Sequence, residues 1–95
     1  MKRATPATRS GSAHMARIKA MRCICCELLS MEQTSPTDCH HIRDDREARN
    51  DFLTIPLCHD GCHQGRLGVH GDRTFLRMLK MSEWGLLGKT LERLE

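Results

Sequence analysis

The chain has 95 residues and a formal net charge of +3, with six cysteines and six histidines but only three residues of the Phe, Trp and Tyr class. A single domain of this size and composition buries little apolar surface, so we expect it to need a disulfide or a metal for stability. The opening stretch MKRATPATRS lacks the apolar core of a signal peptide, and no later stretch is long enough to span a membrane. We therefore expect a reducing, cytoplasmic location without membrane contact, where clustered Cys and His indicate metal binding or catalysis rather than disulfides.

The N-terminal segment is basic. Residues 1–22 carry six lysines or arginines and no acidic residue, which leaves a formal charge of −3 on residues 23–95. Their content of Thr, Ser, Ala and Arg predicts that residues 1–15 form a disordered basic arm. Such an arm either binds phosphate backbones electrostatically or is a solubilising or vector-derived tail. Because GSAHM at residues 11–15 resembles a cloning scar, we attribute no function to residues 1–14.

Residues 16–95 are expected to form the folded domain. Residues 16–22 favour a short helix or a strand, and CHHI at residues 39–42 is short enough to be a strand. The apolar run FLTIPLC at residues 52–58 favours a second strand, which Pro56 confines to a sheet edge or a strand end. Polar loops are expected over two other segments, residues 31–38 and 43–51.

The C-terminal third is expected to be a turn followed by two helices. Residues 59–72 are dense in Gly and His, which favours a tight turn that can pass into a short helix or loop. The first helix has an apolar face between Phe75 and Leu79, and Ser82 is a suitable N-cap for the second. The second helix carries a leucine stripe that we interpret as core: Leu86, Leu87, Leu91 and Leu94.

Four cysteines have the spacing of a structural zinc site. Cys23 and Cys26 form a CxxC pair, and Cys58 and Cys62 form a second pair with three residues between them. Zinc takes four thiolate or imidazole ligands in a tetrahedron, and each short-spaced pair supplies two of them. A zinc bound there would add folding free energy that the small core needs. The spacing leaves open that a neighbour replaces one of these ligands, the candidates being Cys25, His59 and His63. Cys39 lies away from both pairs, and we interpret it as a small buried residue.

A second group of histidines lies between and after the cysteine pairs. His40 and His41 are adjacent, so on a strand their side chains point to opposite faces. At a strand end this lets one imidazole bind a metal while the other approaches a substrate. His63 directly follows a predicted zinc ligand, and His70 and Asp72 come within the next few residues. We therefore predict a second, histidine-rich site beside the second cysteine pair.

Taken in order, these motifs resemble the HNH (ββα-metal) nucleases. The set CICC, HHI, IPLC, CHQG, GVHGD and KMSEWGLL resembles more specifically the phage recombination-enhancement (Ref-type) nucleases, over about residues 20–95. The resemblance implies a small α+β fold: a zinc-stabilised, treble-clef-like ββα-metal domain with C-terminal helices. It also implies a RecA-dependent DNA endonuclease of a bacterial or phage-infected cell, whose partners are DNA and the RecA filament on single-stranded DNA.

The resemblance assigns roles to individual residues. It implies that His41 is the general base, that His63 is a ligand of a catalytic metal ion, and that Asp72 is an acidic residue of the active site. His40 is either a further metal ligand or a structural support, and His70 either faces the site or caps the local turn. Phosphodiester hydrolysis needs an activated water and a divalent ion that acts as a Lewis acid. We expect Mg²⁺ or Mn²⁺, and imidazole ligands favour Mn²⁺.

The sequence departs from the family pattern, and two other functions fit the cysteines. No Asn stands at the middle HNH position; Asn50 and Asp51 come earlier, where we expect them to cap a loop. The N-terminal basic extension is far shorter than in Ref-type proteins.

The first alternative is a non-catalytic zinc module that binds DNA or protein, which would favour exposed aromatic residues or a basic face that this domain is not expected to have. The second is a redox or metal sensor with Cys25 and Cys39 as its switchable thiols.

Overall fold

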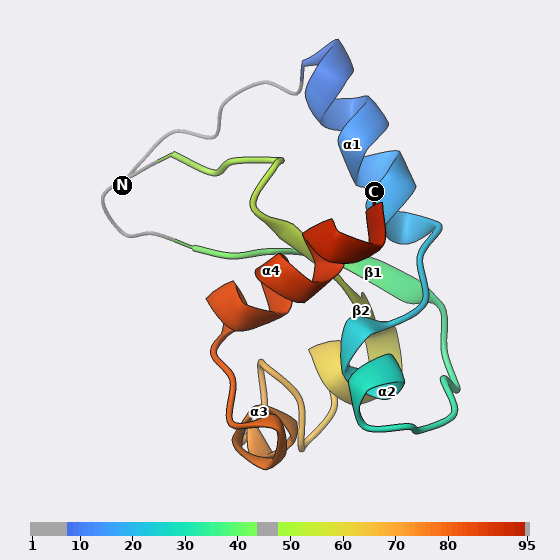
Figure 1. The fold of residues 1–95 in the computed structure, drawn as a ribbon, viewed down its shortest axis with the longest axis vertical. Coiled ribbons are helices and arrows are strands. Elements are labelled where there is room, and N and C mark those ends of the chain that lie inside the picture. The colour runs from blue at the N-terminus through green and yellow to red at the C-terminus, as the bar shows by residue number, and fades with distance from the viewer. Residues whose placement is uncertain (1–7, 44–47, 95) are drawn as a thin grey trace.

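Two antiparallel strands lie at the centre of the fold (Figure 1). In the computed structural model, which describes residues 8–43 and 48–94, β1 (Thr37–His41) pairs with β2 (Thr54–Cys58) and places His40 opposite Ile55. Both predicted strands are therefore present, and in a two-stranded sheet Pro56 lies at an edge, where its missing N–H is tolerated. The helical elements are α1 (Arg9–Lys19), α2 (Ile24–Leu28), η1 (His59–His63), α3 (Thr74–Leu79) and α4 (Glu83–Leu94).

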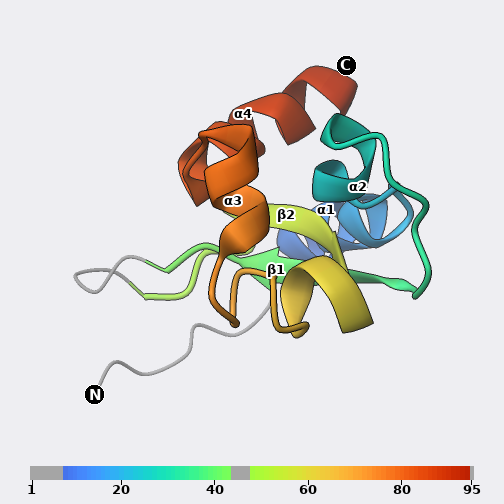
Figure 2. The ribbon, with the colours of Figure 1, turned by 90° about the horizontal axis from the view of Figure 1, so that it is seen from below.

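The helices pack around β2, which is buried along its whole length (Figure 2). Helix α1 contacts both strands, α2 and α4 contact β2, and η1 follows β2 directly and packs against both strands. The wholly buried aliphatic side chains come from four separate elements, α1, α2, β2 and α4: Ile18, Ile24, Ile55, Leu57 and Leu86. The result is a small, compact α+β fold, as the sequence predicted. No helix among the described residues is both long and apolar enough to cross a membrane.

Helix α1 corrects the prediction of a disordered arm over residues 1–15, since the helix begins at Arg9. The side chain of Thr8 caps it by accepting a hydrogen bond of 2.9 Å from the amide of Gly11. Gly11 is buried against the rest of the domain, and a Cβ at this position would lie only 3.1 Å from Oδ2 of Asp51. Residues 8–15 are thus part of the packed domain, and the remainder of the predicted arm, residues 1–7, lies outside the described residues.

The last helix confirms its predicted cap but only part of its predicted core stripe. The amide of Gly85 donates to Oγ of Ser82 at 3.3 Å, so Ser82 is the N-cap of α4. Leu86 and Leu87 are buried, whereas Leu91 is 45% exposed. The stripe therefore ends early, and its next buried position is taken by Thr90, whose hydroxyl donates to the carbonyl of Leu86 at 2.8 Å.

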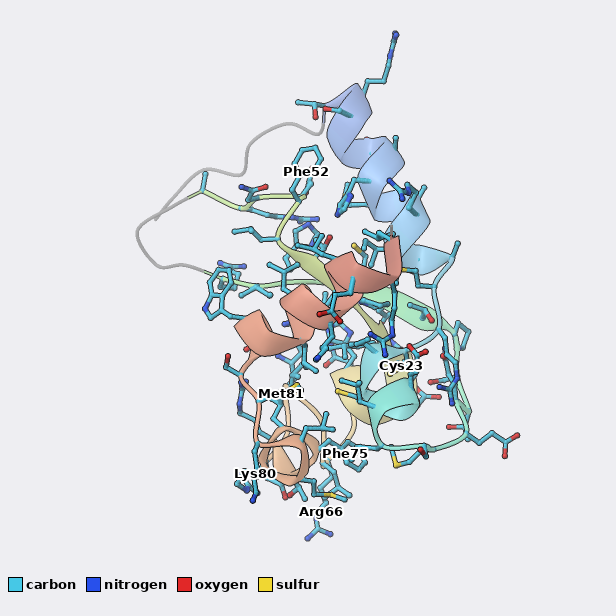
Figure 3. All side chains as sticks on the ribbon, viewed as in Figure 1. Cys23, Phe52, Arg66, Phe75, Lys80 and Met81 are labelled. Atoms are coloured by element: carbon cyan, nitrogen blue, oxygen red, sulfur yellow. The ribbon has the colours of Figure 1, made fainter. Side chains whose placement is uncertain are left out.

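Two aromatic side chains are exposed, contrary to the expectation that the domain has no such surface. Phe52 is 48% exposed and Trp84 is 50% exposed. Phe52 lies in the loop before β2, beside α1 in Figure 3, and its ring centroid is 5.1 Å from that of His14. The composition gave no indication of this, because a low aromatic content does not decide which of the few aromatic residues are buried.

Candidate functional site

The four predicted zinc cysteines meet in the interior. Cys23 precedes α2, and its sulfur accepts a hydrogen bond of 3.4 Å from the amide of Cys26. Cys58 precedes η1 in the same way, and its sulfur accepts one of 3.3 Å from the amide of Cys62. Each pair therefore occupies the first turn of a short helix, where free backbone N–H groups face the sulfurs and favour the thiolate form.

The sulfur separations fit a tetrahedral zinc site. Sγ of Cys26 lies 3.7 Å from Sγ of Cys58 and 3.8 Å from Sγ of Cys62. A tetrahedron with Zn–S bonds of about 2.3 Å separates its sulfurs by about 3.8 Å. A disulfide would need about 2.05 Å, and all six cysteines are free thiols. The prediction that Cys23, Cys26, Cys58 and Cys62 form one buried group is confirmed, and this group could hold a structural metal such as zinc.

Crowding of thiols gives a physical reason for a cation at this position. Burial, followed by the neighbouring thiols of Cys23 and Cys58, raises the pKa of Cys26 to about 12. The pKa of Cys23 is also raised, chiefly by its hydrogen bond with Cys62 and then by burial. Thiolates packed together in an apolar interior repel one another, and a divalent cation between them reverses this effect.

The two remaining cysteines are poorly placed to act as a redox sensor. Cys25 is only 1% exposed and lies outside the group of four cysteines whose sulfurs could hold one metal ion. Cys39 is half-buried, and burial raises the pKa of its thiol. Reactive cysteines are accessible and have lowered pKa values. The geometry therefore argues against the sensor alternative.

Three histidines form a second group beside the four cysteines. Ring centroids of His40 and His63 lie 5.0 Å apart, those of His40 and His70 5.1 Å apart, and those of His63 and His70 4.9 Å apart. Each offers one nitrogen within 4.8 Å of the others, so the group could hold a metal ion. The sequence predicted His40 and His63 as ligands and left the role of His70 open; the structure places all three rings together.

Tight winding of the chain after η1 explains how His70 reaches this group. The amide of Val69 donates to the carbonyl of Cys62 at 2.9 Å, and the amide of His70 donates to the carbonyl of His63 at 3.1 Å. Gly68 allows this close approach, because a Cβ there would lie 2.4 Å from the carbonyl oxygen of Cys62. The glycines of this segment therefore serve to fold His70 back over His63.

In two of these histidines, the outer ring nitrogen, which points away from the other histidines, is hydrogen-bonded to a carboxylate. Nε2 of His40 lies 2.5 Å from Oε1 of Glu83, and Nδ1 of His63 lies 2.7 Å from Oδ2 of Asp38. The hydrogen bond with His40 lowers the pKa of Glu83, and the hydrogen bonds from His63 and His59 lower the pKa of Asp38 against the opposing effect of burial. Both carboxyl groups are therefore ionised and accept the imidazole N–H groups.

This arrangement directs two lone pairs at each other. With their outer N–H groups donated to carboxylates, Nδ1 of His40 and Nε2 of His63 face each other as acceptors at 3.1 Å. Two acceptors at this distance need a proton or a metal ion between them. Carboxylate-backed imidazoles are also the usual outer shell of metal-binding histidines in proteins. The donor set therefore fits a divalent ion held by His40, His63 and His70.

His41 lies on the opposite face of β1 and has its own carboxylate partner. Its Nε2 is 2.8 Å from Oδ1 of Asp51, and both side chains are mostly buried. Burial lowers the pKa of His41, while the hydrogen bond with Asp51 opposes this shift. A neutral imidazole whose Nε2 is bound to a carboxylate has Nδ1 left as a proton acceptor. Asn50 caps the loop as predicted, accepting a 2.9 Å bond from the amide of Phe52, whereas Asp51 proves to be a site residue.

Asp72 does not join the histidine group, which corrects its predicted place among the metal ligands. Its Oδ1 accepts hydrogen bonds from the amide and the hydroxyl of Thr74, at 3.0 and 2.6 Å. The carboxylate thus satisfies free donors at the start of α3 and is exposed. Closeness in sequence to His70 was misleading here, because the chain turns sharply between the two residues.

Three carboxylates of the site were not predicted from the sequence. Asp38 carries a usable signal, since it lies two residues before His40 and therefore on the same face of a strand. It also bonds Nδ1 of the exposed His59 at 2.6 Å, and Asp38, His59 and His63 form another set of potential metal donors. Asp51 precedes β2, and Glu83 comes from the first turn of a distant helix. Nothing local in the sequence pairs Glu83 with a histidine on β1.

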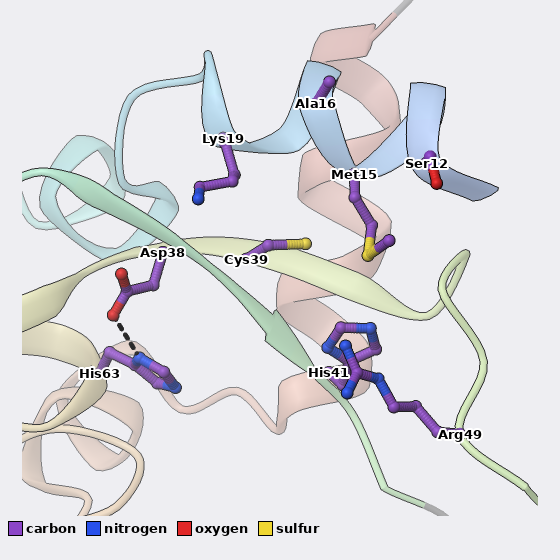
Figure 4. A pocket seen from close by; sticks show the side chains of 9 residues that line it. All are labelled: Ser12, Met15, Ala16, Lys19, Asp38, Cys39, His41, Arg49 and His63. Carbon is purple, nitrogen blue, oxygen red and sulfur yellow. Dashed lines mark hydrogen bonds and ion pairs between the residues drawn. The ribbon is translucent and has the colours of Figure 1, made fainter. Parts of the chain in front are cut away.

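A groove between α1 and β1 connects His41 with His63 (Figure 4). It is open to solvent and has a volume of about 540 Å³. We call it the α1–β1 groove, and its lining residues are Ser12, Met15, Ala16, Lys19, Asp38, Cys39, His41, Arg49 and His63. Because α1 supplies four of these residues, it forms one wall of the candidate site, and one of the four, Ser12, comes from residues 1–14, for which the sequence predicted no function.

Comparison with known proteins provides no family assignment. The chain matches no family model, no curated protein and no solved structure. The resemblance to Ref-type nucleases therefore stays a prediction, and function has to be argued from the geometry of the two groups and the groove.

Proposed function

We propose that this chain is a metal-dependent DNA endonuclease of the HNH, ββα-metal type. The order of β1, β2 and η1 supports this, since two antiparallel strands run directly into a helix that carries a histidine. In this proposal the four-cysteine group holds zinc as a structural brace. His40, His63 and His70 hold a divalent ion, and His41 is the general base. The observation that carries the proposal is that His41 and His63, each held by a carboxylate, line one groove.

The residues of the chain have separate tasks in hydrolysis. Asp51 fixes the ring of His41, so that its other nitrogen can take the proton of a water molecule as the water attacks phosphorus. Burial keeps His41 neutral near neutral pH, which a base requires. When bound, the divalent ion supplies Lewis-acid stabilisation of the negative charge on the phosphate and the leaving oxygen. Asp38 and Glu83 keep the ligand nitrogens of His63 and His40 directed at its position.

The donor set indicates which ion the site prefers. Three imidazole nitrogens suit transition metals, whereas Mg²⁺ prefers oxygen ligands and retains its water. We therefore propose Mn²⁺ or a similar transition metal as the better activator, with Mg²⁺ weaker. The absence of Asp72 from the group removes the one oxygen ligand that the sequence had suggested.

The proposal is tested by incubating the zinc-loaded chain with supercoiled and single-stranded DNA, with Mg²⁺ or Mn²⁺, and with or without RecA filaments. We expect cleavage that His41→Ala lowers by about 10²–10⁴-fold, the usual loss on removal of a general base, with zinc content unchanged and the fold retained. Glu92→Ala is the control, because its side chain is 64% exposed and lies outside every group of potential metal donors among the described residues. We expect it to keep most of the activity.

The substrate panel also separates the rival readings. Cleavage only on RecA filaments would support a Ref-type enzyme, and cleavage without RecA would support a general HNH enzyme. Full activity of His41→Ala would contradict the assignment of the base. DNA binding without cleavage under any condition would favour the non-catalytic zinc module, which the exposed Phe52 and Trp84 make a reasonable alternative.

A further inference from the structure

The α1–β1 groove contains two cations that the proposed chemistry does not use. Lys19 ends α1, and in Figure 4 its amine points from the helix toward β1. Arg49 lies on the loop before β2 with its side chain half exposed, and its Nε is 3.7 Å from Oδ1 of Asp51, the carboxylate that holds His41. The anion among the lining residues, Asp38, already accepts hydrogen bonds from His59 and His63. The groove therefore has one cation on its α1 wall and a second beside His41, where Asp51 is shared between Arg49 and His41.

We infer that the α1–β1 groove binds the backbone of a single DNA strand, with Lys19 and Arg49 contacting phosphates on either side of the reacting one. The inference rests on the proposed function, because it takes His41 and His63 as the reacting centre. Lysine and arginine side chains at a groove wall bind phosphate oxygens irrespective of sequence. Their separation along the groove in Figure 4 would hold the strand across His41.

The size of the groove favours one strand over a duplex. Its volume of about 540 Å³ lies in the range of sites that take up small ligands, about 300–1,000 Å³. A short length of one strand can enter such a space, whereas a duplex could contact only its rim. Helix α1 forms the wall that restricts the opening, since Ser12, Met15 and Ala16 line it along successive turns.

An exposed aromatic ring on the same loop as Arg49 favours the same substrate. Phe52 is three residues beyond Arg49 on the same loop and directly follows Asp51, which holds His41. It packs against His14 of α1 and is 48% exposed, so part of its surface can stack with a base. Proteins that bind single strands combine a cationic groove with such stacking surfaces. A paired base in a duplex has no free face to offer.

The test measures binding rather than cleavage. A fluorescent oligothymidine and a hairpin duplex of equal charge are titrated with the zinc-loaded full chain by anisotropy, without added Mg²⁺ or Mn²⁺, over a range of salt concentrations. We expect Lys19→Ala and Arg49→Ala each to weaken binding of the single strand by about 5- to 10-fold and to lower the salt slope by about 0.7. The control is Arg66→Ala, an exposed cation at the far end of the molecule from α1 in Figure 3, which we expect to bind as the unmodified chain does.

Phe52 tests the choice of a single strand. We expect Phe52→Ala to weaken binding of oligothymidine by about 5- to 20-fold and Phe52→Trp to retain it, with little change for the duplex. The single-strand inference is overturned if the duplex binds more tightly and Phe52→Ala has no effect. If Lys19→Ala and Arg49→Ala both bind DNA as tightly as the unmodified chain, the assignment of the groove as the DNA-binding site is refuted, even when the enzyme cleaves DNA. Conversely, groove-dependent binding without cleavage would refute only the proposed function.

Discussion

The four-cysteine group and the three-histidine group share one short helix yet are held in different ways. Cys58, Cys62 and His63 all belong to β2 or η1, so the two groups are joined through a few residues of backbone. The cysteines are buried and positioned by two similar helix turns. The histidines range from the buried His40 to the exposed His70, and two of them are held by carboxylates from other elements, Glu83 and Asp38. The difference leads us to propose that the first group stabilises the fold, whereas the second is a site that the fold has to orient.

The largest expected effect follows from this comparison and concerns the cysteines. We expect Cys26→Ser to abolish zinc binding and to unfold the domain at room temperature, because the buried core is small and loss of a structural metal is among the most costly changes known. Zinc content of the purified chain and its circular dichroism provide the measurement. Because the histidine group shares η1 with the cysteines, cleavage should disappear together with the zinc.

The matched control for this substitution is Cys25→Ala. Cys25 is adjacent in sequence and equally buried, but it lies outside the four-cysteine group. We expect it to retain one zinc per chain and to lose only the small packing contribution of its side chain. Retention of zinc by Cys26→Ser together with its loss in Cys25→Ala would reverse the ligand assignment.

The second prediction weakens the histidine group without unfolding the chain. We expect Asp38→Asn and Glu83→Gln each to lower the affinity for the catalytic ion by about 10–100-fold, since each removes the carboxylate that directs a ligand imidazole. The dependence of cleavage on Mn²⁺ concentration measures this affinity, and much of the rate should return at saturating Mn²⁺. Asp60→Asn, on the exposed side of η1, is the control and should leave the dependence unchanged. Unaltered Mn²⁺ dependence in both site variants would exclude a positioning role for these carboxylates.

These two regions also show how far the sequence could be interpreted. The cysteine group could be predicted in full, because its ligands come in short pairs whose spacing alone places them on one turn. The three-histidine group was predicted in part: His40 and His63 could be named, but His70 required the winding of the glycine-rich segment. Glu83 could not be found, since it meets His40 from a position 43 residues away in the chain. Contacts of that kind arise from the packing of α4 against the sheet, which no local pattern encodes.

Helix α1 illustrates a different error: the composition of residues 1–15 predicted disorder, whereas a helix begins at Arg9. Small and polar residues lower the apparent tendency of residues 9–15 to fold, yet the helix is capped by Thr8 and needs the small Gly11 to lie against Asp51. Glycine has a low helix propensity, yet tertiary packing requires it at position 11. The same contact connects α1 to the base, because Asp51 is the partner of His41.

The third prediction concerns this partner of the base. We expect Asp51→Asn to lower the cleavage rate about tenfold, because a neutral amide replaces a charge-assisted hydrogen bond that fixes the ring of His41. The change should fall on the maximal rate and leave the Mn²⁺ dependence unaltered, since Asp51 lies outside the three-histidine group. Single-turnover cleavage over a range of Mn²⁺ concentrations separates the two quantities. A shift in Mn²⁺ dependence at unchanged maximal rate would assign Asp51 to the metal site instead.

The smallest effect is expected at Asp72, the residue that the sequence placed in the active site and the structure places at the start of α3. Asp72→Ala should leave cleavage and Mn²⁺ dependence unchanged and lower the free energy of unfolding slightly, because the amide and hydroxyl of Thr74 lose their side-chain acceptor. Denaturant unfolding and cleavage assays on the same preparation provide both readings. Asp72→Asn should restore much of the stability, because the amide oxygen can still accept the hydrogen bond from Thr74. If Asp72→Ala instead abolished cleavage with normal stability, the metal site would include a carboxylate ligand in addition to the three histidines. The comparison between the four-cysteine group and the three-histidine group would then have to include Asp72.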